Sequence, residues 1–258
     1  MAIALYLTSL ERSGPTMSTI RRRIPAIARA HRQAGQVSAT TDPRVLKVLE
    51  GIARSRKKEK PTKKTALVRD PLLDVVDRID VSANMGLRDR ALVLLRFPIG
   101  VRRSELVALT VEELTPSPDG VLVRIGSSKT DQHGVGEELL VVYAEPPRPC
   151  AVRALRAWMD AAEITEGAIF RRVSWADTVG GKLSAQSVAL IIKKRVKAAG
   201  LRPANFAGHS LRSGYTTQAA RDGHPYEQIK AVTRHKDDRV LAGYIHAGRG
   251  AEDVARVL

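Results

Sequence analysis

The chain has 258 residues, 43% of them hydrophobic and 4% aromatic, with one cysteine and a formal net charge of +16. This composition is typical of a globular protein. It excludes an internal disulfide, a cysteine-based zinc site and the base-stacking surface of a single-strand binder. No apolar run approaches the roughly 20 residues of a membrane helix, and the first residues lack the pattern of an export signal, so we expect a cytoplasmic protein without membrane contact.

The positive charge is concentrated at the start of the chain. Residues 1–65 hold 15 Lys and Arg against 4 Asp and Glu, a net charge of +11, whereas the other 193 residues carry a net charge of +5. Solubility alone does not require such an excess. A polyanion is therefore the expected partner of this segment.

The first 55 residues predict a small helical domain. IALYLTSLER, STIRRRIPAIARAHRQ and PRVLKVLEGIARS each have the apolar spacing of an amphipathic helix. Pro25 inside the second segment is expected to kink or split that helix, and Asp42 before Pro43 is typical of a helix start. The basic, apolar-poor run RKKEKPTKKT that follows predicts a linker over residues 56–68.

Residues 69–258 predict a second, larger domain. LRDRALVLLRF, RRSELVALT, CAVRALRAWMDAAEI and SAQSVALIIKKRVKAAG favour helices, as does most of the sequence after residue 208. SPDGVLVRIGSSK and EELLVVY favour two β-strands, because they are rich in Val, Ile and Leu and are bounded by turn residues. The expected fold class is mainly α, with a helical N-terminal domain and a mostly α catalytic domain that holds a small antiparallel β-sheet.

Four short motifs carry the residues that could perform chemistry. The chain has no HExxH, no CxxC pair and no Walker loop. The motifs GVRRSEL, SSKTDQHG, GHSLRSG and RHKDDRVLAGY hold Arg102, Glu105, Lys129, His209, Arg212, His235 and Tyr244. Each motif alone is weak evidence, since an arginine on a helix is usually solvated and a buried histidine is usually structural. His235 with Asp237 and Asp238 is also a weak candidate for a metal cluster, without further carboxylates of matching spacing.

In this order and spacing the motifs resemble the tyrosine recombinases, the phage integrase family. The segments LVRIGSSKTDQHGVGEELLV and GHSLRSGYTTQAARDG look especially like its Cre-type members. The resemblance covers nearly the whole chain. It implies a DNA core-binding domain over residues 1–55, a basic linker over 56–68 and a catalytic domain over 69–258. It also implies a site-specific recombinase that needs no metal or cofactor and that cleaves and rejoins DNA through a 3′-phosphotyrosine, in integration, excision or resolution.

The resemblance implies a role for each matching residue. Arg102 and Arg212 would clamp the non-bridging phosphate oxygens and neutralise the charge of the transition state. Tyr244 would be the nucleophile, because its phosphate ester keeps the bond energy needed for religation.

The remaining site residues would support this attack. His209 would assist proton transfer, Lys129 would protonate the leaving 5′-oxygen, and His235 would donate a hydrogen bond to the phosphate. Glu105 matches the acidic position of the family and would orient its neighbours. One departure is Arg234, which stands before His235 where the family usually has a small residue, often glycine.

The implied partner is double-stranded DNA with inverted half-sites, bound by two subunits per site and by four in synapsis, so the protein would be associated with the nucleoid. Basic residues of the first segment are candidates for contacts with this DNA: Arg21, Arg22, Arg23, Arg56, Lys57, Lys58, Lys60, Lys63 and Lys64.

Two alternatives remain open at this level. A topoisomerase IB or a telomere resolvase uses a similar residue set, and an integrase-derived protein that only binds DNA would keep the basic segment without the activity. Other conspicuous side chains are interpreted as packing residues, namely Tyr215, Tyr226 and Trp158.

Overall fold

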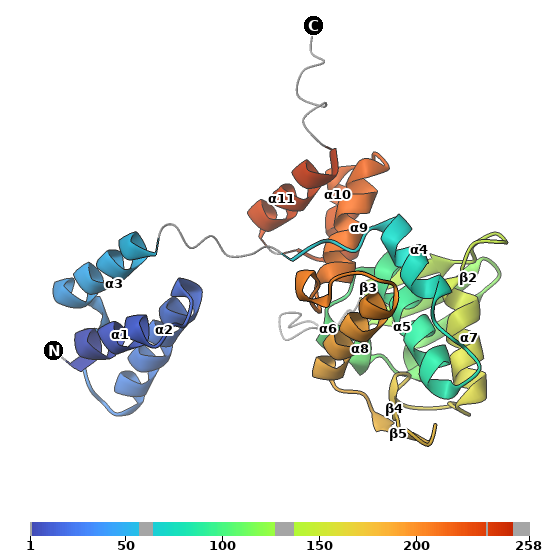
Figure 1. The fold of residues 1–258 in the computed structure, drawn as a ribbon, viewed down its shortest axis with the longest axis horizontal. Helices are drawn as coiled ribbons and strands as arrows, with labels where there is room; N and C mark the ends of the chain where they lie inside the picture. The colour runs from blue at the N-terminus through green and yellow to red at the C-terminus, as the bar shows by residue number, and fades with distance from the viewer. Residues whose placement is uncertain (1, 57–63, 127–136, 236, 250–258) are drawn as a thin grey trace, which may run out of the picture. The chain divides into compact units, whose positions relative to one another are not determined.

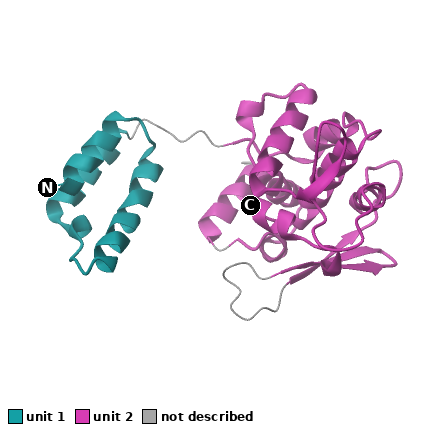
Figure 2. Cartoon of the chain, turned by 90° about the horizontal axis from the view of Figure 1, so that it is seen from below, with its two compact units in different colours: residues 1–63 teal, residues 64–258 magenta. Residues whose placement is uncertain are grey.

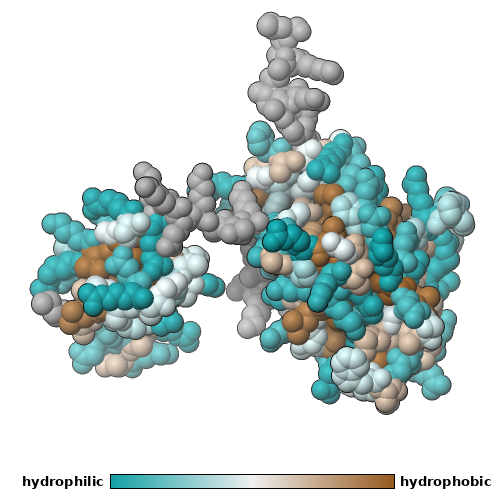
Figure 3. Space-filling model, in the orientation of Figure 1, coloured by the Kyte–Doolittle hydropathy of each residue, from teal (hydrophilic) through white to brown (hydrophobic). Residues whose placement is uncertain are grey.

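The computed structural model describes residues 2–56, 64–126, 137–235 and 237–249. The chain divides into two compact units, Met1–Lys63 and Lys64–Leu258 (Figures 1 and 2). Each unit buries its own apolar core, and the faces visible in Figure 3 are mostly hydrophilic with small separate apolar patches. Among the described residues no helix combines the length and the apolar character that a membrane crossing needs.

Unit 1 is a three-helix domain. It contains α1 (Ala2–Arg12), α2 (Met17–Gln33) and α3 (Pro43–Ser55), with a short 3-10 turn, η1 (Ala39–Thr41), before α3. Leu7, Ile20 and Ile52 meet in its core. The helix α2 continues through Pro25, so the expected split does not occur. The carbonyl that loses its donor lies four residues earlier, at exposed Arg21, where water can bond it.

Unit 2 is mostly helical, and the fold class predicted from the sequence is confirmed. Its helices are α4 (Arg69–Asp77), α5 (Asn84–Ile99), α6 (Arg103–Ala108), α7 (Ala151–Ala161), α8 (Ala185–Ala198), α9 (Ser210–Arg221), α10 (Tyr226–Thr233) and α11 (Asp238–Arg249). Two short 3-10 turns, η2 (Val111–Glu113) and η3 (Pro203–Asn205), complete the helical part.

Two small antiparallel sheets complete unit 2. One has the order β1 (Leu114–Ser117), β2 (Gly120–Ile125), β3 (Glu137–Val142), and the other pairs β4 (Arg171–Val173) with β5 (Val179–Lys182). The second hairpin was not predicted, because RRV and VGGK are too short and too polar to show the alternation of a half-buried strand.

The central helix α5 determines where the functional residues lie. Residues 91–96 of α5 are all buried, and the helix packs against α7 and α9. Trp158 of α7 is fully buried and its indole N–H donates to Ile169 O at 2.9 Å, which confirms it as a core residue. Gly100 caps the C-terminal end of α5 and is the first residue of the GVRRSEL motif, so this motif lies beside α9.

The start of unit 2 also packs on α9. The Leu67 N–H donates to Ser210 O at 2.8 Å and the Thr65 N–H to Asn205 O at 2.7 Å. A Cβ atom on Gly214 would lie 1.9 Å from Leu67 O, so glycine is what permits this approach. The end of the predicted linker, residues 64–68, is therefore part of the packed unit, whereas residues 57–63 lie outside the described part of the chain.

Candidate active site

A glycine at the end of α5 places Arg102. Gly100 has a left-handed conformation (φ 57°), which favours glycine, and the chain reversal brings Arg102 to the N-cap of α6. Glu105, in the first turn of α6, accepts from the Arg102 backbone N–H at 2.7 Å and from its guanidinium at 2.6 Å. Backbone and side chain of Arg102 are thus fixed by one carboxylate.

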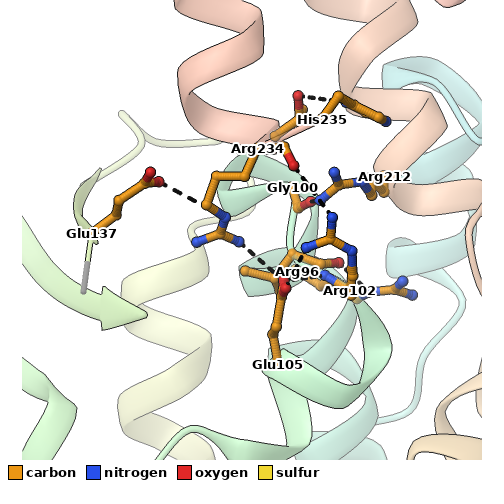
Figure 4. A network of polar contacts seen from close by, with 10 residues as sticks. Arg96, Gly100, Arg102, Glu105, Glu137, Arg212, Arg234 and His235 are labelled. Atoms are coloured by element: carbon orange, nitrogen blue, oxygen red, sulfur yellow. Dashed lines mark hydrogen bonds and ion pairs between the residues drawn. The ribbon is translucent and has the colours of Figure 1, made fainter. Parts of the chain in front are cut away.

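The same glycine holds the second arginine. Arg212, in the first turn of α9, is 5% exposed, and its Nη1 donates to Gly100 O at 2.6 Å. Burial, with a further contribution from Arg102, lowers the pKa of Arg212 to about 10, which leaves it charged at neutral pH. Figure 4 shows both guanidiniums close to the turn that carries His235. Two positive charges held this close together are suited to bind a phosphate group.

Two histidines lie beside these arginines. His235 Nδ1 is 2.7 Å from Thr233 Oγ1. Desolvation, followed by Arg212 and Arg102, lowers the pKa of His235 to about 4. His209 precedes α9 and is exposed, and its pKa is also lowered, first by desolvation and then by the surrounding arginines. Both imidazoles are therefore mainly neutral at pH 7, so each has one nitrogen that can accept a proton.

Tyr244 reaches the site from α11. Leu241 and Ile245 of this helix are buried in a cluster with Ala219 and Ala220 of α9, which fixes the helix on unit 2. The half-buried Tyr244 ring lies with its centroid 6.2 Å from that of His235. Five of the six predicted catalytic side chains are thus described, and they come from α9, α11 and the turns before α6, α9 and α11.

Lys129, the sixth, lies outside the described residues. Among the described residues, β2 and β3 pair antiparallel with Ile125 opposite Glu137. Glu137 Oε2 is 3.9 Å from Arg234 Nε, so this end of the sheet lies near the site.

Arg96, which none of the four motifs contains, supports the turns that carry Arg102 and His209. Its side chain is fully buried and donates to Val101 O and Gly208 O, the residues before Arg102 and His209. Burial lowers its pKa to about 9, and its Nη1 has no hydrogen-bond partner among the described residues. The sequence signal that could have pointed to Arg96 is its position as the one charged residue in the apolar run LVLLRFPI, where an unpaired charge is costly.

The other tyrosines near the motifs are packing residues, as predicted. Tyr215 meets Phe97 edge to face with ring centroids 6.2 Å apart, and Tyr226 Oη donates to Asp238 Oδ1 at 2.9 Å.

Asp237 accepts from a backbone N–H in the first turn of α11 at 3.0 Å. In the part of the chain that the structure describes, no three His, Cys, Asp or Glu side chains gather as a metal ion would require.

The candidate DNA contacts differ in their surroundings. Arg21, Arg22 and Arg23 are exposed on α2. Arg56 instead donates to the carbonyls of Pro15 and Glu11, which indicates an anchoring role within unit 1. Four further candidates, Lys57, Lys58, Lys60 and Lys63, lie outside the described residues, and Lys64 donates to Ala204 O at 2.7 Å.

Comparison with known proteins identifies the family. The model of the phage integrase family matches residues 70–249, most of unit 2. The chain belongs to the phage integrase family. An integrase/recombinase XerD homolog from Selenomonas ruminantium is 39% identical over 242 residues, covering 92% of this chain and 71% of that protein. This membership makes the chain a tyrosine site-specific recombinase.

Two more distant matches agree with this family. A tyrosine recombinase XerD from Corynebacterium glutamicum is 27% identical over 175 residues, covering 68% of this chain and 53% of that protein. Among solved structures, a lambda integrase tetramer bound to a Holliday junction shares the fold, with 16% identity, 96% of this chain and 71% of that chain covered, and a TM-score of 0.53. The matches do not favour the topoisomerase, telomere resolvase or silent DNA-binding alternatives, and they do not confirm the narrower likeness to Cre-type recombinases.

Proposed function

We propose that the recombinase breaks and rejoins strands of duplex DNA through a covalent bond between Tyr244 and a 3′-phosphate. The observation that carries this proposal is the convergence of Tyr244, His235 and two fixed arginines in unit 2. The Tyr244 ring lies 6.2 Å from His235, and the pKa of His235 is lowered first by desolvation and then by Arg212 and Arg102.

The chemistry follows from this arrangement. A backbone phosphate lies between Arg102 and Arg212, and Tyr244 Oη attacks its phosphorus atom. The bond from phosphorus to the 5′-oxygen breaks as the bond to Tyr244 forms. Neutral His209 accepts the phenol proton, and Lys129 supplies a proton to the leaving 5′-oxygen.

His235 completes the phosphate site. Its Nδ1 lies 2.7 Å from Thr233 Oγ1, and that hydroxyl donates its own proton to Ile229 O at 2.7 Å, so in the neutral ring Nδ1 is the donor and Nε2 is an acceptor. A hydrogen bond from Nε2 to a non-bridging oxygen then requires that the ring gain a proton, which the negative charge of a bound phosphate favours. The reverse reaction uses the same groups. The 5′-hydroxyl of a second strand attacks the phosphotyrosine, releases Tyr244 and restores a phosphodiester without an external energy source.

The basic first segment is proposed to bind the DNA around the cleavage point. Arg21, Arg22 and Arg23 are exposed on α2 and can offer positive charge to phosphates, although the Arg23 guanidinium also donates to the Tyr6 hydroxyl. Residues 1–55 would then be the core-binding domain, residues 56–68 a basic tether and residues 69–258 the catalytic domain. The expected DNA site has two inverted half-sites with one subunit on each, so that two subunits occupy a site and four assemble in synapsis. The tetramer of the lambda integrase structure supports the last of these numbers.

Covalent trapping tests the proposed reaction. The probe is a library of duplexes with randomised sequence and one nick, because a nick lets the cut fragment diffuse away and retains the adduct. Protein-linked DNA that resists denaturing detergent and carries a free 5′-hydroxyl at the cut is the expected product. A protein that binds selected duplexes tightly but yields neither adduct nor strand transfer would contradict the proposal.

A further inference from the structure

Arg234 stands in a conformation that does not suit arginine. It ends α10 with φ 52° and ψ 46°, in the left-handed region, which glycine enters without the steric cost that a Cβ atom brings. Its backbone N–H donates to Lys230 O at 2.7 Å, so the backbone is a regular helix end. The arginine side chain is therefore not needed for this turn, and its contacts must be sought elsewhere.

The side chain of Arg234 reaches two acidic residues of other elements. Its Nη2 lies 3.1 Å from Glu105 Oε2 of α6, and its Nε lies 3.9 Å from Glu137 Oε2 of β3. Figure 4 shows the guanidinium between these two carboxylates. The Glu105 contact is the stronger, because both side chains are largely buried (16% and 10% exposed), whereas Glu137 is 56% exposed.

Residue 234 also contacts Arg102 directly. The Arg102 Nη2 donates to the Arg234 carbonyl at 3.3 Å, and the Arg102 Nη1 donates to Glu105 Oε1 at 2.6 Å. Arg102 is thus fixed from two sides, by the backbone of residue 234 and by a carboxylate that Arg234 shares. Burial opposes ionisation of Glu105, but Arg102 and Arg234 outweigh it and hold its pKa below the usual range.

Sharing this carboxylate has an electrostatic consequence. A carboxylate bound by Arg102 alone would cancel most of the positive charge that Arg102 offers to a phosphate. With a second guanidinium on the same carboxylate, Arg102, Glu105 and Arg234 together keep a net charge of +1, which the more distant and 56% exposed Glu137 offsets only in part. The geometry of Arg102 is fixed while its capacity to attract an anion is retained.

We propose that Arg234 is a positioning residue for strand cleavage, which shares Glu105 with Arg102 and joins the turn of His235 to α6 and to the start of β3. The proposal rests on the function proposed above. Arg234 does not touch the phosphate in this arrangement, since its guanidinium faces Glu105 and Glu137. It acts through Arg102 and through the position of the next residue, His235.

Three substitutions separate this role from a purely structural one. Arg234→Gln removes the charge and keeps the strained backbone, Arg234→Gly removes both the charge and the strain, and Arg234→Lys keeps both. On a saturating nicked duplex we expect the single-turnover cleavage rate of the Gln and Gly variants to fall about tenfold, which is within the range of coupling inside one hydrogen-bonded network. The rate of the Lys variant should stay within about threefold of the wild-type rate. Arg234→Gly should nevertheless unfold at the same or a higher temperature than the wild type.

A matched control removes a positive charge elsewhere on unit 2. Arg221 is exposed at the far end of α9, nine residues after Arg212, and Arg221→Gln should cleave at the wild-type rate. If Arg234→Gly and Arg234→Gln also cleave at that rate, or if the rate follows thermal stability across the three variants, the positioning role is wrong.

A second measurement does not depend on cleavage. A double-mutant cycle between Arg234→Gln and Glu105→Gln, followed by urea unfolding, should give a coupling free energy clearly different from zero, and the Arg102 side-chain N–H signals should lose exchange protection in Arg234→Gln. Absence of a covalent adduct in the wild type would refute the proposed function. Additive unfolding effects with unchanged Arg102 protection would refute the role of Arg234, whatever the cleavage assay shows.

Discussion

The titration of His235 provides a quantitative test of the site in the DNA-free protein. The perturbation is acidification, compared between the wild type and His235→Asn, which keeps a hydrogen-bonding side chain without a titrating group. The pKa of His235 is lowered from 6.5 to about 4, first by desolvation and then by Arg212 and Arg102. Between these two pH values the unfolded chain therefore binds a proton that the folded chain refuses.

The sign and size of the effect follow from proton linkage. The free energy of unfolding falls as the pH falls from about 6.5 to about 4, whereas above pH 7 both states are neutral and His235 contributes nothing. At about 1.4 kcal/mol per pKa unit the full shift corresponds to about 3 kcal/mol. Because the ring is only partly buried, solvent screening reduces the expected loss to about 2 kcal/mol.

Urea unfolding at pH 7 and pH 4.5, at constant ionic strength, measures this loss. Fluorescence of buried Trp158 reports unit 2. Between these pH values the free energy of unfolding of the wild type should fall by about 2 kcal/mol more than that of His235→Asn. The carboxyl groups with lowered pKa values are present in both proteins, so their contribution cancels in this comparison. His246→Asn, on exposed His246 of α11, serves as the matched histidine-to-asparagine control outside the site. An equal loss in the wild type and His235→Asn would refute the electrostatic description of the site.

Three further predictions concern other parts of the molecule. Arg212→Lys should lower the single-turnover cleavage rate about 100-fold with little change in duplex affinity, since a lysine cannot hold a backbone carbonyl and a phosphate in fixed geometry. Equal cleavage by both proteins in a quenched-flow assay would contradict this. Gly214→Ala should destabilise the protein by at least about 2 kcal/mol in urea unfolding, because the new Cβ atom would lie 1.9 Å from Leu67 O. Replacing Arg21 and Arg22 by glutamine should reduce the slope of log affinity against log salt by about 0.9 for each phosphate that is no longer neutralised, and an unchanged slope would remove α2 from the DNA interface.

Local signals in the sequence account for most of the helices and one of the two sheets. Thr16 accepts from the Thr19 N–H at the start of α2, and Asp42 accepts from the Arg44 N–H at the start of α3, as N-cap residues are expected to do. The strands β2 and β3 follow from their run of β-branched residues. These features depend on neighbours within a few residues, so a single sequence contains the information that specifies them.

The internal geometry of the site could not be predicted in the same way. The order of the motifs identified the family, but the contact between Arg102 and the Arg234 carbonyl joins residues 132 positions apart, and that between Arg96 and Gly208 joins residues 112 positions apart. Local periodicity contains no information on such pairs. The role of Arg234 in particular depends on a left-handed helix end and on two carboxylates from other elements, and only the folded chain brings these together.

The proposed reaction depends above all on Tyr244 being the attacking residue. We would isolate the protein–DNA adduct formed on nicked duplexes, digest both components and locate the modified residue by mass spectrometry, with Tyr244→Phe in parallel. We expect a nucleotide attached through its 3′-phosphate to Tyr244 alone and no adduct in Tyr244→Phe. A nucleotide on Tyr215 or Tyr226, or an adduct that persists in Tyr244→Phe, would contradict it.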